Sequence, residues 1–158
     1  MITCRALERA CLLGAVTGMR STMGVAIFSR HLGNRSRNMP LPPELRFFAG
    51  PRAANLLTGL SAGELVVDKL PMTPARTVPV AVVVRAVLGA IVGAAACIEE
   101  RENPVAGAFV GASAAVAATY GAYTLRRWLT QDLCLPDPLV AGAEDTLAFT
   151  IGNRAVEL

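Results

Sequence analysis

The residues that could do chemistry are charged side chains placed inside otherwise apolar stretches. Two of them are basic, Arg20 and Arg85. Four are acidic and could exchange protons or balance the arginines: Glu64, Asp68, Glu144 and Asp145. A charge near the middle of a bilayer costs about 2.5–3.5 kcal/mol, so such residues pair with one another or mark a path for an ion or substrate. We therefore predict a central polar cluster in which the two arginines face Glu64 and the Glu144–Asp145 pair.

The same charges allow a structural interpretation, in which they are ion pairs that lock a small bundle together. Glu64 and Asp68 are one helical turn apart and would share one face of a helix. Arg20 lies roughly 15 Å into its apolar stretch at 1.5 Å per residue, close to the middle of a membrane. The hypothesis that we carry forward is that these six residues line an ion or substrate path.

The elements that must position these residues are membrane helices. The 158-residue chain is 53% hydrophobic and 17% charged, whereas a soluble domain usually carries about 25% charged residues. Its apolar blocks approach the length of about 20 residues that crosses a bilayer as a helix. We expect one all-α domain over residues 1–158, a small polytopic bundle of four to five membrane-embedded helices. The five expected segments cover residues 10–29, 53–70, 77–98, 104–125 and 139–151.

Two layouts of these segments compete. If all five cross, the basic loop at residues 30–52 shares a side with the acidic loop at residues 99–102, which suits the positive-inside rule poorly. If the second and fifth segments only dip into the membrane, the basic loop and the Arg126 and Arg127 pair lie opposite the acidic loop. We prefer this second layout, in which the first, third and fourth segments span and the other two are half-depth or re-entrant.

Glycines recur at four-residue spacing, which allows helices in lipid to approach closely. The pairs are Gly14 and Gly18, Gly59 and Gly63, Gly89 and Gly93, and Gly107 and Gly111. We expect them to pack helices together and expect the protein to form homo-oligomers. Residues 14–32 also align without gaps on residues 111–129, which suggests an internal repeat of the kind found in transporters.

Several classes of protein are disfavoured. The net charge of +3 comes mostly from arginines that flank apolar blocks, a pattern typical of membrane topology and not of a nucleic-acid-binding face. The four cysteines form no close pair and His31 is the only histidine, so we expect no metal site. We expect no cofactor, and a non-enzymatic role is favoured.

The chain resembles a bacterial family of small membrane proteins, the domain of unknown function numbered 4126. The resemblance rests on GMRS at residues 18–21, ELVVDKLPMTPART at residues 64–77, Arg85, and AEDTLAF at residues 143–149. It covers nearly the whole chain and implies membrane location, with no activity to carry over. We expect a multi-pass protein of the bacterial inner membrane.

A fainter resemblance links GMRSTMG at residues 18–24, with Glu64 and Asp68, to the re-entrant and acidic motifs of undecaprenyl-diphosphate phosphatases. It implies that Arg20 would hold phosphate and a carboxylate would handle protons. The chain lacks the proline and the first serine of the re-entrant motif.

Three functions are therefore considered. The first is a small transporter or channel for an ion or a small anionic solute. The second is a membrane enzyme or carrier that acts on lipid phosphate, and the third is a non-catalytic membrane scaffold. The partners expected in every case are the lipid bilayer and further copies of the chain.

Overall fold

The computed structural model describes residues 4–67 and 78–158. Within these ranges the chain forms seven α-helices and no strand. They are α1 (Cys4–Met19), α2 (Met23–Arg35), α3 (Arg46–Ala49), α4 (Pro51–Val67), α5 (Pro79–Glu99), α6 (Pro104–Gln131) and α7 (Asp137–Glu157), with a short 3-10 turn, η1 (Pro43–Leu45), before α3. The all-α class expected from the sequence is confirmed.

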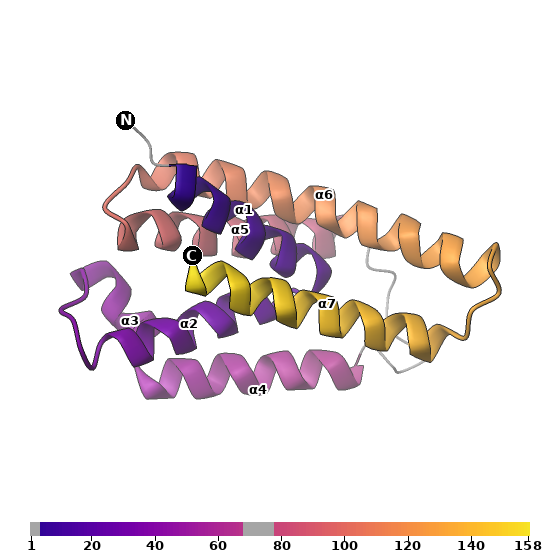
Figure 1. The fold of residues 1–158 in the computed structure, drawn as a ribbon, viewed down its shortest axis with the longest axis horizontal. Coiled ribbons are helices and arrows are strands. Elements are labelled where there is room, and N and C mark those ends of the chain that lie inside the picture. The colour runs from indigo at the N-terminus through magenta and orange to yellow at the C-terminus, as the bar shows by residue number, and fades with distance from the viewer. Residues whose placement is uncertain (1–3, 68–77) are drawn as a thin grey trace.

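Proline and asparagine set where the longer helices begin. Pro79 and Pro104 occupy the first turns of α5 and α6, where a missing N–H costs nothing and the fixed φ suits a helix. Asn103 caps α6, because its side chain accepts a hydrogen bond from the Val105 N–H at 2.9 Å. The two long apolar helices are therefore joined by a turn of only four residues, 100–103, and pack side by side as an antiparallel pair (Figure 1).

The first expected segment, residues 10–29, is not one helix. The chain leaves α1 after Met19, turns at residues 20–22, and runs back along α1 as α2 (Figure 1). Gly24 makes this return possible, because a Cβ there would overlap the Leu13 carbonyl and the Thr17 hydroxyl. We call α1, residues 20–22 and α2 the hairpin, and residues 20–22 its tip.

The second and fifth expected segments were predicted to be half-depth or re-entrant, and neither turns back within the described residues. α4 is a single helix up to Val67, and α7 is a continuous helix of 21 residues, about 32 Å long at 1.5 Å per residue. The chain that turns back is the first segment instead. The predicted repeat fails for the same reason, since residues 14–32 form a hairpin whereas residues 111–129 lie within the uninterrupted α6.

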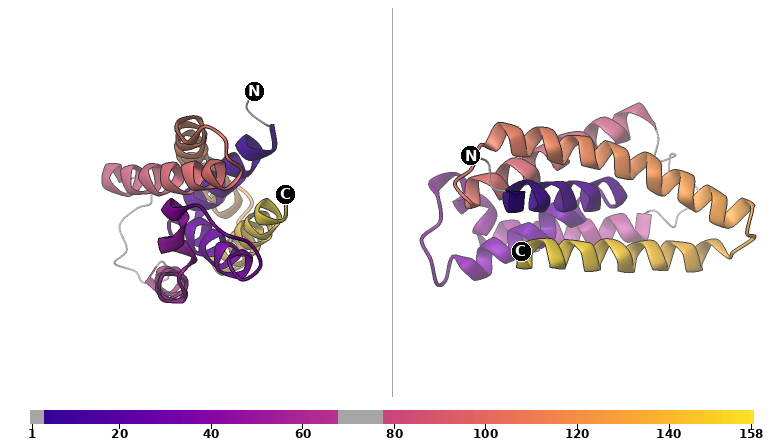
Figure 2. Two further views of the ribbon diagram at one scale, coloured as in Figure 1. Left: turned by 90° about the vertical axis from the view of Figure 1, so that its left-hand side faces the viewer. Right: turned by 45° about the horizontal axis from the view of Figure 1, so that its top comes forward.

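The preferred loop layout is also wrong. The basic loop and the acidic loop lie at the same end of the bundle, since Arg35 Nη1 is 3.0 Å from Glu99 Oε1. The start of α1 and the C-terminal end of α7 lie at that end as well (Figure 1, Figure 2). The layout failed because it treated the two loops as independent charges, whereas Glu99 of the acidic loop pairs with Arg35 of the basic loop.

Glycines form the contacts among α1, α5 and α6. A Cβ at Gly14 would overlap the Gly111 carbonyl, one at Gly18 the Ala115 carbonyl, and Gly93 and Gly107 would collide in the same way. Gly89 likewise faces the Gly111 backbone. The pair on α4 differs. Gly59 and Gly63 are exposed, and a Cβ added at either would have no neighbouring atom within 4 Å, so the expected packing is absent there within the described part of the chain.

This contrast predicts opposite effects of one substitution. Gly111→Ala should lower the free energy of unfolding by about 1–3 kcal/mol, because the methyl group has no room and must push α5 and α6 apart. Gly59→Ala, the matched control, should leave stability unchanged or raise it by about 0.5–1 kcal/mol, as alanine favours an exposed helix. Unfolding of the two purified variants measures both; equal effects would contradict the close approach at Gly111.

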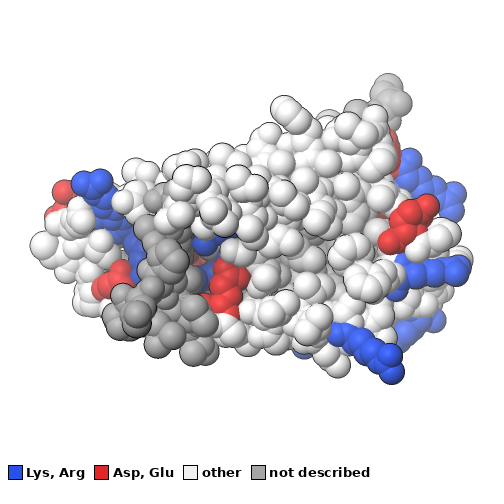
Figure 3. All heavy atoms as spheres, turned by 180° about the vertical axis from the view of Figure 1, so that it is seen from behind, with Lys and Arg blue, Asp and Glu red and all other residues white. Residues whose placement is uncertain are grey.

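Two of the described helices, α5 and α6, are long and apolar enough to cross a membrane. Only 39% of the most apolar window of α5 and 22% of that of α6 is buried, so their apolar side chains mostly face outward. The exposed ones include Val80, Val83, Val87, Val105 and Phe109. On the face shown in Figure 3, charged side chains gather towards the two ends and leave a broad uncharged area between them.

Candidate functional site

The hairpin tip exists because tertiary partners replace helical hydrogen bonds. In a continuous helix the Thr22 N–H would donate to the Gly18 carbonyl. Instead the Thr22 N–H donates to Glu64 Oε2 at 3.0 Å, and the Gly18 carbonyl accepts from the Thr119 hydroxyl at 3.0 Å. The break is therefore held by α4 on one side and α6 on the other.

Glu64 supplies the cap that α2 lacks in its own sequence. Its Oε1 accepts from the Ser21 N–H at 2.8 Å, and its Oε2 also accepts from the Thr22 hydroxyl at 2.9 Å. Thr22, the N-cap residue, makes no side-chain cap of its own. The first N–H groups of a helix are unsatisfied donors at the positive end of its dipole, so they favour a negatively charged group.

Two buried arginines flank the tip. Arg20 is 3% exposed and its Nε donates to Asp145 Oδ1 on α7 at 2.5 Å, with Nη2 of the same guanidinium also paired to that oxygen. Arg85 is 5% exposed and its Nε donates to the Ser21 hydroxyl at 3.1 Å. Arg85 is fourteen residues before Glu99, about 21 Å along the helix, so the cluster lies inside the bundle and not at the loop end.

The structure therefore brings together only some of the six residues that were expected to line a path. It brings four of them to the hairpin tip: Arg20, Glu64, Arg85 and Asp145. Glu144 instead lies beside Arg126, with Oε2 3.7 Å from Nη1. Asp68 lies outside the described residues. We call the four residues at the tip the tip cluster.

A pocket of about 300 Å³ lies next to the tip cluster, between α6 and α7. Its walls are mostly apolar and include Met19, Leu125, Val140 and Leu147, with Arg126 and Glu144 among the lining residues. Arg126 also binds Asp137 through Nε and Nη2, at 2.9 and 2.7 Å. These contacts join the two helices at the end of the bundle away from the acidic loop (Figure 1).

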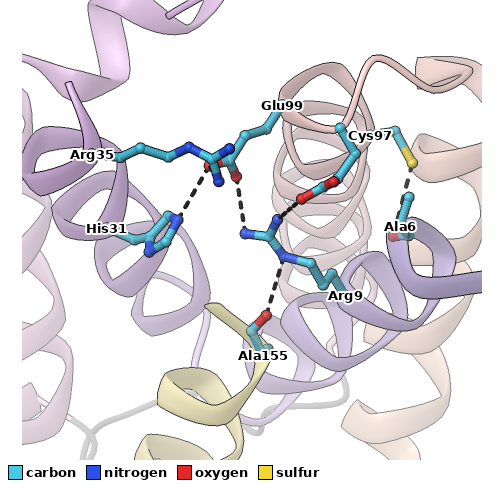
Figure 4. A network of polar contacts seen from close by, with 8 residues as sticks. Ala6, Arg9, His31, Arg35, Cys97, Glu99 and Ala155 are labelled. Carbon is cyan, nitrogen blue, oxygen red and sulfur yellow. Dashed lines mark hydrogen bonds and ion pairs between the residues drawn. The ribbon is translucent and has the colours of Figure 1, made fainter. Parts of the chain in front are cut away.

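A second charged cluster was missed by sequence reasoning. Arg9, 1% exposed, donates from Nη2 to Glu99 at 2.9 Å, from Nη1 to Glu100 at 2.6 Å and from Nε to the Ala155 carbonyl at 3.2 Å. His31 and Arg35 approach Glu99 from α2, as Figure 4 shows. We call these groups the end cluster. It joins α1, α2, α5 and α7 at one end of the bundle.

A signal for the buried position of Arg9 is present in the sequence. Leu13 and Val16 follow it at helical spacing and share one face of α1. Leu13 and Val16 are fully buried, so an arginine on the same face is expected to be buried and paired. The expected first segment began only at residue 10, which left Arg9 in the flank before it.

The chemistry open to the tip cluster is charge binding and proton exchange. Among residues 4–67 and 78–158, no group of three or more histidine, cysteine or acidic side chains could hold a metal ion. The described groups at the tip are two guanidiniums, two carboxylates, two hydroxyls and two helix N–H donors. Such a set can bind an anion, or can transfer a proton between a carboxylate and a bound solute.

Comparison with known proteins gives one finding. The sequence profile of a family described as "Domain of unknown function (DUF4126)" matches residues 9–158. No curated protein and no solved structure matches the chain. The match covers nearly all of the helices described above, including both charged clusters.

Proposed function

The chain belongs to the DUF4126 family, whose description assigns no activity, and we propose from the geometry of the tip cluster that it is a small membrane transporter or channel. Its cargo would be an ion or a small anionic solute. In this proposal the protein is a multi-pass protein of the bacterial inner membrane. The observation that carries the proposal is the broken first segment, whose tip holds charged side chains inside the bundle.

Membrane insertion is supported by surface chemistry. α5 and α6 are long and apolar with most of their apolar windows exposed, which would be costly in water. The aromatic side chains Tyr120, Tyr123 and Trp128 are exposed near the end of α6, just where aromatic residues anchor a helix at a membrane interface. Arg126 and Arg127 lie in the same stretch.

Transport is supported by the form of the hairpin. Many transporters bind anionic groups at the N-terminus of a discontinuous helix within the membrane. Here α2 begins inside the bundle, and the N–H groups of Ser21 and Thr22 just before it face a carboxylate and not lipid. The buried guanidiniums of Arg20 and Arg85 lie at the same place as the carboxylates of Glu64 and Asp145, and in this proposal they would bind an anion or an ion exchanged against a proton.

Flux through proteoliposomes tests the proposal. Purified protein should carry at least one member of a panel of monovalent ions, sulfate and phosphate. Arg85→Gln should reduce that flux about tenfold or more, because losing the hydrogen bond from the buried guanidinium to Ser21 costs about 1.5–3 kcal/mol, more than the 1.4 kcal/mol that a tenfold change represents. Arg127→Gln is the matched control, since Arg127 is exposed and the hydrogen bond of its side chain goes to Gln131, at the surface of α6. No flux for any member of the panel would contradict the proposal.

A second function, action on lipid phosphate, is favoured by one observation. The Thr22 hydroxyl donates to the Glu64 carboxylate at 2.9 Å, which is the arrangement of a hydroxyl beside a base. Phosphate release from polyprenyl diphosphate that is lost in Thr22→Val would favour this enzyme over a transporter.

Homo-oligomer formation stays a prediction; the exposed Gly59 and Gly63 on α4 are a surface on which a second copy could pack.

A further inference from the structure

A groove lies over α2, between α4 and α7. Each of these two helices packs on α2 (Figure 1), so α2 forms the floor of the groove and the other two form its walls. Its surface is mostly apolar and includes Met23 and Ile27 on the floor and Ala62 and Phe149 on the walls. The groove holds about 230 Å³, less than the 300–1,000 Å³ of a site that encloses a whole small ligand. A single flexible chain fits such a space better than a compact solute does.

One basic side chain lies in this groove. Arg30 lines it from the C-terminal half of α2, and its Nε donates to the Thr58 hydroxyl at 3.0 Å. Thr58 is itself held in place, because its hydroxyl donates to the Ala54 carbonyl at 2.7 Å. Arg30 is exposed, and no acidic side chain pairs with it among the described residues. A guanidinium held through Nε can still bind a phosphate group through its Nη atoms.

Ser61 is the second polar feature of the groove. It is 9% exposed and lines the same wall about one helical turn from Thr58. Within residues 4–67 and 78–158 its hydroxyl has no hydrogen-bond partner, whereas a hydroxyl on so buried a residue usually has one. An oxygen atom of a bound ligand would supply the missing acceptor.

We propose that the groove binds one anionic glycerophospholipid, with its phosphate on Arg30, an ester oxygen on Ser61 and one acyl chain along the apolar floor. Ser61 lies three residues beyond Thr58 in the direction of Glu64, about 4.5 Å deeper at 1.5 Å per residue. The floor continues to Met23, seven residues from Arg30 and about 10 Å away along α2. The groups along the groove therefore follow the order of phosphate, ester and chain in a glycerophospholipid.

The charges at this end of the bundle favour an anionic lipid. Three further arginines are exposed between the end of α2 and the first turn of α4: Arg37, Arg46 and Arg52. Basic residues beside membrane helices attract anionic headgroups. The pocket between α6 and α7 differs, because its Arg126 is already bound by Asp137. The inference rests on the membrane location in the proposed function and is independent of transport.

Native mass spectrometry of the detergent-purified protein tests the proposal, with phosphatidylglycerol as the probe. Arg30→Gln should bind this lipid at least about tenfold more weakly than the wild type, because the contact between guanidinium and phosphate is charged. Arg37→Gln, at an exposed position outside the groove, is the matched control and should behave as the wild type. Phosphatidylcholine with the same chains should bind the wild type more weakly. Equal phosphatidylglycerol affinity of Arg30→Gln and the wild type would overturn the proposal.

A second pair of variants tests the apolar part of the groove. Ala62→Leu fills the groove without touching the charge and should also weaken phosphatidylglycerol binding about tenfold. Gly63→Leu is its control, since Gly63 is exposed and a Cβ there would have no neighbouring atom within 4 Å. Ser61→Ala should cost about threefold, the loss of one neutral hydrogen bond. If Ala62→Leu instead abolished dimers and left lipid binding unchanged, the occupant would be a second copy and the proposal would be wrong.

The same assay distinguishes a lipid from a free phosphate. Inorganic phosphate in excess should not displace phosphatidylglycerol, because it has no chain to occupy the apolar floor; displacement would contradict a lipid ligand. Binding and flux also fail separately. Lipid binding that depends on Arg30 without flux would keep this site and contradict transport, whereas flux with equal lipid binding in Arg30→Gln would contradict this site alone.

Discussion

Arg9→Gln is expected to lower the free energy of unfolding by about 3–5 kcal/mol, the usual cost of removing one partner from a buried ion pair. Arg9 and the Glu99 side chain are each 1% exposed. The substitution would leave the Glu99 carboxylate inside the bundle with less positive charge around it. It would also remove the Nε contact that holds the Ala155 carbonyl on α7. Unfolding by titrated SDS in mixed micelles measures the loss.

Arg5→Gln is the control for this result. Arg5 lies one turn earlier on the same helix and is exposed, so the same change should alter stability by no more than about 0.5 kcal/mol. Combining Arg9→Gln with Glu99→Gln should recover part of the loss, because the buried negative charge goes with the positive one. Identical stabilities for Arg5→Gln and Arg9→Gln would show that the end cluster does not hold the bundle.

Neutralising Arg20 and Asp145 together is expected to preserve the fold and stop transport. Each single change, Arg20→Gln or Asp145→Asn, should cost about 2–4 kcal/mol, less than a fully buried pair because the Asp145 side chain is 25% exposed. The double variant should regain most of this stability, since the positive and the negative charge are then removed together.

The flux of the double variant shows whether Arg20 and Asp145 act on the cargo or only hold the helices together. A folded double variant without flux means that the charges act on the cargo. Wild-type flux in the double variant would mean that Arg20 and Asp145 only hold the tip to α7. The same pair of measurements, stability and flux, is made on one protein preparation, so that a poorly folded sample is not mistaken for an inactive one.

The charged residues inside apolar stretches predicted which side chains gather in the bundle, but not which of them contact one another. Arg20, Glu64 and Arg85 each interrupt an apolar stretch, and the structure gathers them at one tip. The sequence could not decide between Glu144 and Asp145, because neighbours on a helix point about 100° apart. That angle sends Asp145 to Arg20 and Glu144 towards Arg126.

The hairpin could not be foreseen from local sequence. Residues 10–29 have the length and hydropathy of one span, and nothing within them ends a helix as firmly as a proline would. The break depends on Glu64 and Thr119, which lie far along the chain and take over the hydrogen bonds of the missing turn. Hydrogen bonds to residues so far along the chain cannot be predicted from hydrophobic periodicity, because periodicity depends only on residues close in sequence.

The hairpin imposes an order on biogenesis. Arg20 and Asp145 are separated by 125 positions, and Arg9 and Ala155 by 146. During synthesis both arginines emerge from the ribosome long before their α7 partners are translated, so the contacts between the hairpin and α7 form only after the last helix is made. Maturation of this small bundle therefore ends with docking of its C-terminal helix, and a nascent chain stalled before α7 would lack the Asp145 partner of Arg20 and the Ala155 partner of Arg9.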